Sequence, residues 1–137
     1  MLLDPQLVTE TKAWFTKANA DLRAATYEFS AEPPLLEDIV FHCQQAAEKS
    51  LKGFLTWHNL PFRKTHSIES VGEQCLLFDA TLKRIVDRAV PLTEYAWKYR
   101  YPGEPGKPDE AEARDALVVA RDVYAAVLER LPGEVHP

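Results

Sequence analysis

The chain has 137 residues, of which 46% are hydrophobic, and it carries a formal net charge of −5 at pH 7. This length and apolar content suffice for one compact core, so we expect one domain over residues 1–137; the negative charge argues against binding nucleic acid through bulk electrostatics. The chain opens with neither a cationic segment nor an apolar stretch long enough for a signal peptide or a membrane span, which predicts a cytoplasmic protein with no membrane partner.

Apolar residues recur at helical spacing in nearly every segment, and no segment alternates with period two, so the pattern predicts an all-α protein. A first helix ends at the break Glu32-Pro33-Pro34, and a second helix covers residues 35–58. The apolar stripe of the first helix consists of Val8, Phe15, Ala18, Leu22, Ala25 and Phe29. That of the second consists of Val40, Cys43, Ala47, Leu51 and Phe54.

A short third helix is predicted over residues 67–78, and Asp79 is a suitable N-cap for a fourth. Pro91 removes a backbone donor, which predicts a kink or a restart there. Residues 101–108 are too rich in proline and glycine for regular structure. Asp109, with Glu112 three residues later, resembles a capping box at the start of the last helix, and we expect residues 132–137 to fray.

Four polar residues of the second helix, His42, Gln45, Lys49 and Lys52, follow one another at steps of three, four and three. At about 100° per residue they share one narrow face, roughly opposite the apolar stripe. One interpretation is a solvated surface. The other is a strip that contacts a phosphate or nucleotide, or one half of a dimer interface; no catalytic base is paired with a nucleophile along it.

His66 and the run Tyr99-Arg100-Tyr101 are the other candidate functional residues. His66 either fixes the loop between the second and third helices or takes part in chemistry. The aromatic and cationic run is suited to stacking on bases while Arg100 holds a phosphate, but the same residues are also suited to closing the end of a bundle. Arg100 is the strongest single candidate.

The sequence predicts neither a metal site nor a cofactor. Cys43 and Cys75 lack metal-type spacing, and we expect both thiols to be reduced and buried. The four histidines form no metal-ligand pattern, and no glycine-rich phosphate loop, nucleophile elbow or paired-carboxylate motif is present.

Residues 41–55, FHCQQAAEKSLKGFL, resemble the central helix of HEPN-domain proteins, the higher eukaryote and prokaryote nucleotide-binding domain family. The spacing to Thr65-His66-Ser67-Ile68 and to Tyr99-Arg100-Tyr101-Pro102 is also similar, as is an opening helix that carries Trp14 and Asp21-Leu22. The resemblance extends from about Trp14 to Leu131.

This resemblance implies an antiparallel up-and-down bundle of four to five helices, usually a homodimer, found mainly in bacteria and archaea. Dimerisation also has a physical motive, because a small bundle with three Trp, five Tyr and six Phe is prone to leave an apolar face uncovered. Members often stand beside a minimal nucleotidyltransferase in a toxin–antitoxin-like module, and a nucleotide-binding role has been proposed for them. Many relatives are metal-independent ribonucleases that use an Arg, usually a following polar residue, and a His four to six residues further on.

The chain departs from the ribonuclease pattern. Arg63 is too close to His66, and Arg100 has no His within reach downstream. Only Arg130 and His136 have the required spacing, but a leucine follows the Arg, and the His lies on the tail that is expected to fray.

Three interpretations follow. The favoured one is a non-catalytic HEPN homodimer that binds a nucleotide, RNA or a partner minimal nucleotidyltransferase. A metal-independent ribonuclease with a non-standard site built from Arg100, His66 and His42 is the alternative, and a purely structural interaction module is the third. In the favoured interpretation, the ligand-binding residues are His42, Gln45, Lys49, Lys52, His66, Tyr99, Arg100 and Tyr101.

Overall fold

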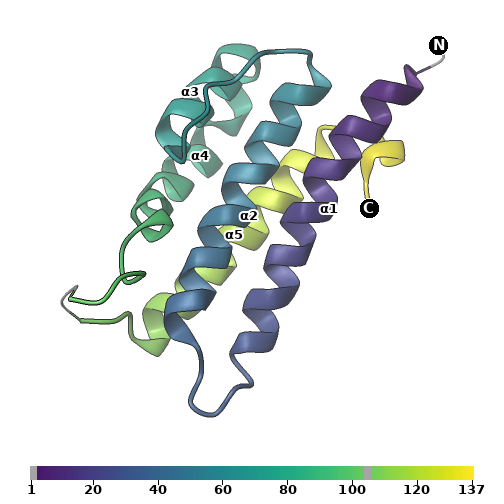
Figure 1. The fold of residues 1–137 in the computed structure, drawn as a ribbon. Helices are drawn as coiled ribbons and strands as arrows, with labels where there is room; N and C mark the ends of the chain where they lie inside the picture. Colours follow the sequence, from purple (N-terminus) through teal and green to yellow (C-terminus); the bar gives the residue numbers. More distant parts are fainter. Residues whose placement is uncertain (1–2, 104–105) are drawn as a thin grey trace.

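The computed structural model describes residues 3–103 and 106–137, and it is an all-α bundle with no strand among those residues (Figure 1). Residues 58–67 turn back along α2, so that α3 lies beside α2 and runs in the same direction. The chain then reverses, and α4 and η2 run antiparallel to α3 before α5 begins (Figure 1). In chain order the elements are α1 (Pro5–Glu28), α2 (Leu36–Trp57), α3 (Ile68–Phe78), η1 (Ala80–Leu82), α4 (Lys83–Ala89), η2 (Val90–Ala96), α5 (Glu110–Glu129) and η3 (Gly133–Val135), where η denotes a 3₁₀ helix.

Helices α1 and α2 form an antiparallel hairpin around the predicted break (Figure 1). The side chain of Asp4 accepts a hydrogen bond from the backbone N–H of Gln6. Pro5 occupies the first turn, where a backbone N–H would have no partner within the helix, so the lack of an N–H on proline costs no hydrogen bond. α2 begins and ends within one residue of the prediction. Its first turn carries Glu37 and Asp38, whose negative charge is favourable beside the helix N-terminus.

The section from α3 to η2 follows the predicted signals closely. The hydroxyl of Ser67 caps α3 by accepting from the N–H of Ser70, and the carboxylate of Asp79 accepts from the N–H of Thr81 at the start of η1. The α-helical pattern of α4 stops at Ala89, and η2 continues through Pro91 as a 3₁₀ helix. This confirms the predicted interruption, because a proline cannot donate the i→i−4 bond that would continue the α-helix.

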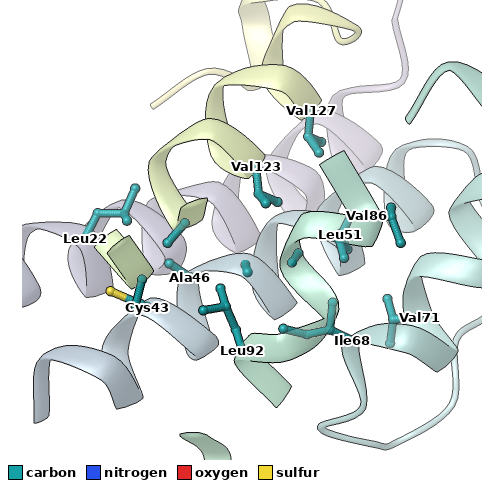
Figure 2. Packing of buried hydrophobic residues seen from close by; sticks show 14 of the residues in the cluster. Leu22, Cys43, Ala46, Leu51, Ile68, Val71, Val86, Leu92, Val123 and Val127 are labelled. Atoms are coloured by element: carbon teal, nitrogen blue, oxygen red, sulfur yellow. The ribbon is translucent and has the colours of Figure 1, made fainter. Parts of the chain in front are cut away.

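α2 lies at the centre of the bundle and contacts α1, α3, η2 and α5. Figure 2 shows apolar side chains from α1, α2, α3, α4, η2 and α5 meeting in one core, among them Leu22, Ala46, Leu51, Val86 and Val123. Small residues on α2, such as Ala46 and Ala47, are fully buried and allow the neighbouring helices to approach closely. The two cysteines, Cys43 and Cys75, are free and buried, and burial raises the pKa of each thiol to about 12, so both remain protonated.

The last helix starts where the capping pattern predicts, since the Asp109 carboxylate accepts from the N–H of Glu112 at 2.8 Å. The hydroxyl of Tyr95 donates a short hydrogen bond to the Glu112 carboxylate and ties η2 to α5. Part of the preceding irregular segment, Glu104 and Pro105, lies outside the described residues.

The tail does not fray as expected. Residues 133–135 form η3, which packs against α1, and the side chain of Val135 is fully buried. His136 Nε2 lies 2.8 Å from the carbonyl oxygen of Leu128, which ties the tail to the end of α5. The expectation rested on position in the chain alone, whereas one buried valine and a histidine contact hold this segment in place.

Across the described residues, no helix combines the length and the apolar character that crossing a bilayer requires.

Candidate functional site

The polar strip on α2 faces other parts of the protein. His42 Nδ1 lies 3.1 Å from Oδ1 of Asp21 on α1, and Lys49 Nζ lies 2.8 Å from Oδ2 of the same carboxylate. Glu28, two turns further along α1, places Oε1 at 3.7 Å from His42 Nε2. The Asp21 carboxylate therefore binds both His42 and Lys49, and these two contacts help to fix how α1 and α2 are aligned along each other.

A second network surrounds Glu48, which is only 4% exposed. Its carboxylate accepts from Lys52 Nζ at 3.0 Å and from the side-chain amide of Gln44 at 2.9 Å, and it lies 2.8 Å from His66 Nδ1. Lys52 also donates to the backbone carbonyl of Thr65 at 3.1 Å. Glu48 thus joins the middle of α2 to the segment at residues 58–67.

These contacts show that the expectation of a solvated face is wrong for most of the strip. Lys52 is 8% exposed, and His42, Gln45 and Lys49 are half-buried. α1 and residues 58–67 cover the face, and burying the ammonium groups is tolerable because carboxylates pair with them. The Gln45 amide donates to the side-chain oxygen of Gln44 at 2.6 Å, so it too is engaged inside the protein.

The sequence reasoning missed the acidic partners of the strip, although two signals were available. Glu48 precedes Lys52 by four residues, which is the spacing of helical ion pairs. Asp21 and Glu28 are seven residues apart and therefore lie on one face of α1. That face meets His42, which only the pairing of the helices reveals.

Arg100, the strongest single candidate from the sequence, lies against Phe41 near the start of α2. Its guanidinium carbon is 3.6 Å from the centroid of the Phe41 ring, and among the described residues no carboxylate forms an ion pair with it. The N–H of Arg100 donates to the carbonyl of Trp97 at 3.3 Å in a turn that keeps these residues together. Trp97 and Tyr101 are 53% and 66% exposed, so they do not close the end of the bundle.

Tyr99 has a different role from its two neighbours. Its φ of 68° is in the left-handed region that a bulky residue rarely adopts, and its ring stacks on Tyr95 with the centroids 6.3 Å apart. Lys98 Nζ lies 4.9 Å from the centroid of the Tyr99 ring. This turn directs Tyr99 toward the core and leaves the next two side chains, Arg100 and Tyr101, exposed.

Arg100 and His42 both contact Phe41, whereas His66 contacts Glu48 instead. Arg100 covers the Phe41 ring, and the His42 ring meets the same phenylalanine in an edge contact with the centroids 5.7 Å apart. His66 pairs with Glu48, which lies six residues beyond His42, or about 9 Å along the helix axis. Five hollows on the described part of the chain are lined by other residues, and none of these five includes Arg100, His42 or His66.

The one pair with ribonuclease-type spacing, Arg130 and His136, is used to hold the fold. Arg130 donates to the hydroxyl of Thr81 and lies 3.4 Å from the carboxylate of Asp79, while His136 contacts carbonyl oxygens at the end of α5. Among the described residues, no group of three His, Cys, Asp or Glu side chains is arranged to hold a metal ion.

We expect the imidazole of His42 to titrate above its ordinary pKa of 6.5. The hydrogen bond to Asp21 is the largest cause, burial opposes it, and the charges of Glu28 and Asp38 add to the increase. The resulting stabilisation is fully present below about pH 6.5 and is lost as the pH rises through the raised pKa. Proton NMR titration of His42 measures this pKa, and Asp21→Asn is expected to lower it.

His58 provides the internal comparison for that titration. Burial beneath Phe78, on which its ring stacks at 3.9 Å, lowers the pKa of His58. Its pH dependence therefore runs the other way: protonation of His58 destabilises the fold at low pH, and this penalty disappears as the pH rises to about 6.5. A His42 pKa at or below that of His58 would contradict the assignment of the Asp21 contact.

Comparison with known families gave one match. Residues 11–131 match the family model described as the HEPN domain. The comparisons with curated proteins and with solved structures gave no match.

Proposed function

Because the chain belongs to the HEPN domain family, we propose that it binds a nucleotide or an RNA end without cleaving it, through a surface at one end of α2. We call this the Arg100 surface and define it by Phe41, Trp97, Arg100 and Tyr101. We place its action in the cytoplasm.

One observation carries the proposal: Arg100 is exposed and stacks on an aromatic ring, and no carboxylate of the described residues neutralises it. A guanidinium held flat on a ring keeps its N–H edge free to donate to two phosphate oxygens. The adjacent exposed rings of Trp97 and Tyr101 supply flat surfaces for bases. The lysines of α2 differ, because Lys49 and Lys52 already pair with carboxylates.

The same geometry favours binding over cleavage. A general base must lie within hydrogen-bond reach of the 2′-hydroxyl, either directly or through one water. His66 is held by Glu48 away from Phe41, and His42 is half-buried between two carboxylates. In this proposal, His42, Gln45, Lys49, Lys52 and His66 position α2 beneath the surface instead of contacting the ligand.

We also propose that the functional unit is a homodimer and that its partner is a minimal nucleotidyltransferase in a toxin–antitoxin-like module, as the family resemblance implies. Exposed large apolar side chains support an interface of this kind, among them Leu77 and Phe78 at the end of α3.

The test is to incubate a labelled RNA of mixed sequence with the protein in the absence of divalent metal and to measure both retention and cutting. We expect retention without cutting by the unaltered protein. Arg100→Ala should weaken retention by about tenfold, since one charge-assisted contact is lost. Arg100→Lys should recover only part of the affinity, because a lysine neither stacks nor binds two oxygens at once.

His66→Ala and Arg84→Ala are the controls, since His66 is held away from the surface and Arg84 is an exposed arginine on α4. Sedimentation of the same samples measures whether one or two chains carry the RNA. Cutting that both Arg100→Ala and His66→Ala abolish would establish a ribonuclease instead.

A further inference from the structure

A groove runs between the C-terminal half of α1 and α5, on the other side of α1 from the contact between Glu28 and His42. Two adjoining hollows of about 410 and 380 Å³ form it, and both are lined by Thr26 and Arg121. Arg23 and Tyr27 line the first hollow, and Arg114 and Val118 line the second. α1 and α5 make few contacts with each other compared with those that each makes with α2, which leaves this seam open.

The charge of the groove has the opposite sign to that of the whole chain. Three guanidinium groups line the two hollows and no carboxylate lines either, although the chain has 21 acidic and 16 basic residues. Such a local concentration of positive charge in a hollow attracts anions even when the net charge is negative. We call this surface the arginine groove and define it by Arg23, Tyr27, Arg114 and Arg121.

The three arginines are exposed, and among the described residues Glu110 is the only carboxylate that forms an ion pair with any of them. Arg121 donates to the hydroxyl of Thr26 at 2.7 Å, which aims its guanidinium across the groove toward α1. Arg114 pairs with Glu110 on its own helix, in an exposed pair of the kind that contributes little. No ion pair involves Arg23 within the described part of the chain.

The arrangement fits a chain of anions better than a single one. Arg114 and Arg121 are seven residues apart, or about 10 Å along the axis of α5, and Arg23 on α1 lines the same hollow as Arg121. Tyr27, in the same hollow as Arg23 and Arg121, is 80% exposed. Spaced cations along a groove with an exposed aromatic ring beside them are the combination that binds single-stranded nucleic acid.

We propose that the arginine groove binds the phosphate backbone of single-stranded RNA and that Tyr27 stacks on one base. This inference rests on the proposed RNA binding and adds a second contact surface to it. An acidic peptide satisfies the arginines equally well. RNA is favoured because the exposed tyrosine ring and the spaced guanidinium groups match the alternation of bases and phosphates along a strand.

The test measures the affinity of the full chain for a short, labelled single-stranded RNA at several salt concentrations. Arg23→Gln with Arg121→Gln is expected to weaken binding by about a hundredfold, or tenfold for each arginine. The slope of log affinity against log salt should become less steep by about 1.4, because each lost phosphate contact contributes about 0.7 for a single strand. Tyr27→Ala should weaken binding by about tenfold and leave the salt slope unchanged.

Arg63→Gln with Arg84→Gln is the charge-matched control, since both arginines are exposed and neither lines the groove. Arg23→Gln alone is a second variant, because the Arg23 side chain forms no hydrogen bond or ion pair with the described residues. Circular dichroism checks that each variant is folded. Binding that falls equally in the control pair would overturn the groove assignment.

The remaining outcomes separate the two proposals. If Arg100→Ala weakens binding and the groove variants do not, the arginine groove is not an RNA site and the Arg100 surface stands. If the unaltered chain retains no RNA, the arginine-groove proposal fails, and the proposed function fails as far as RNA is its ligand. If polyglutamate binds in a manner that depends on Arg23 and Arg121 while RNA binding does not, the groove takes an acidic protein segment and the RNA assignment is wrong.

Discussion

Replacing Glu48 with alanine is expected to lower the free energy of unfolding by about 3 to 5 kcal/mol, which is the usual cost of leaving a buried charge without its partner. Lys52 would lose the carboxylate at 3.0 Å and keep only the carbonyl of Thr65. Gln44 and His66 would lose the same acceptor. Urea denaturation followed by circular dichroism measures the change.

The second half of this experiment removes both charges. Glu48→Met combined with Lys52→Met should be less destabilising than Glu48→Met alone, since no ammonium group then remains buried without a partner. The exposed pair Lys83 and Asp87, which has the same spacing of four residues on α4, is the matched control. Asp87→Ala should cost less than about 0.5 kcal/mol. Equal costs at Glu48 and Asp87 would show that burial of the Glu48 network contributes nothing.

Replacing Gly53 with valine is expected to cost about 3 kcal/mol, because α1 crosses α2 too closely to admit a side chain there. A Cβ atom on Gly53 would lie 2.6 Å from Cε2 of Phe15 and 3.1 Å from Cβ of Trp14. The Phe15 ring is fully buried, and a close-packed interior resists the shift of a ring of this size. Thermal and urea unfolding of the variant measure the loss.

A compensating substitution tests whether the clash is with this ring. Phe15→Leu shortens the side chain, so the double variant should lose about 1 kcal/mol less than the sum of the two single changes. Gly133→Val is the control, since no atom lies within 4 Å of a Cβ at that position. Strict additivity of Gly53→Val and Phe15→Leu would place the strain elsewhere.

The fold was largely predictable because its signals are local. Apolar spacing indicated the helices, Asp79 and Asp109 marked two starts, and Pro91 marked the interruption after α4. The tail was predicted wrongly, because its order depends on Val135 entering a space between elements that are distant in the sequence. No local pattern around residues 132–137 encodes that space.

The candidate site was predictable only as a set of residues. The sequence placed His42, Gln45, Lys49 and Lys52 on one face of a helix, and that placement holds. It did not tell whether the face meets water or protein, because exposure depends on which helices pack beside it. The partner Asp21 lies 28 residues from Lys49, and no helical or strand spacing relates positions so far apart.

By itself, the sequence determined the helical class, the positions of the main helices and the family, because each of these follows from local spacing or from a continuous motif. Only the tertiary structure decided that the strip on α2 is neutralised by Asp21, Glu28 and Glu48, that Arg100 rests on Phe41, and that Arg23 and Arg121 face each other across a groove. The physical reason is that desolvation and charge pairing depend on distances in space. Those distances are set when α1, α2 and α5 pack together, not by the order of residues along any one of them.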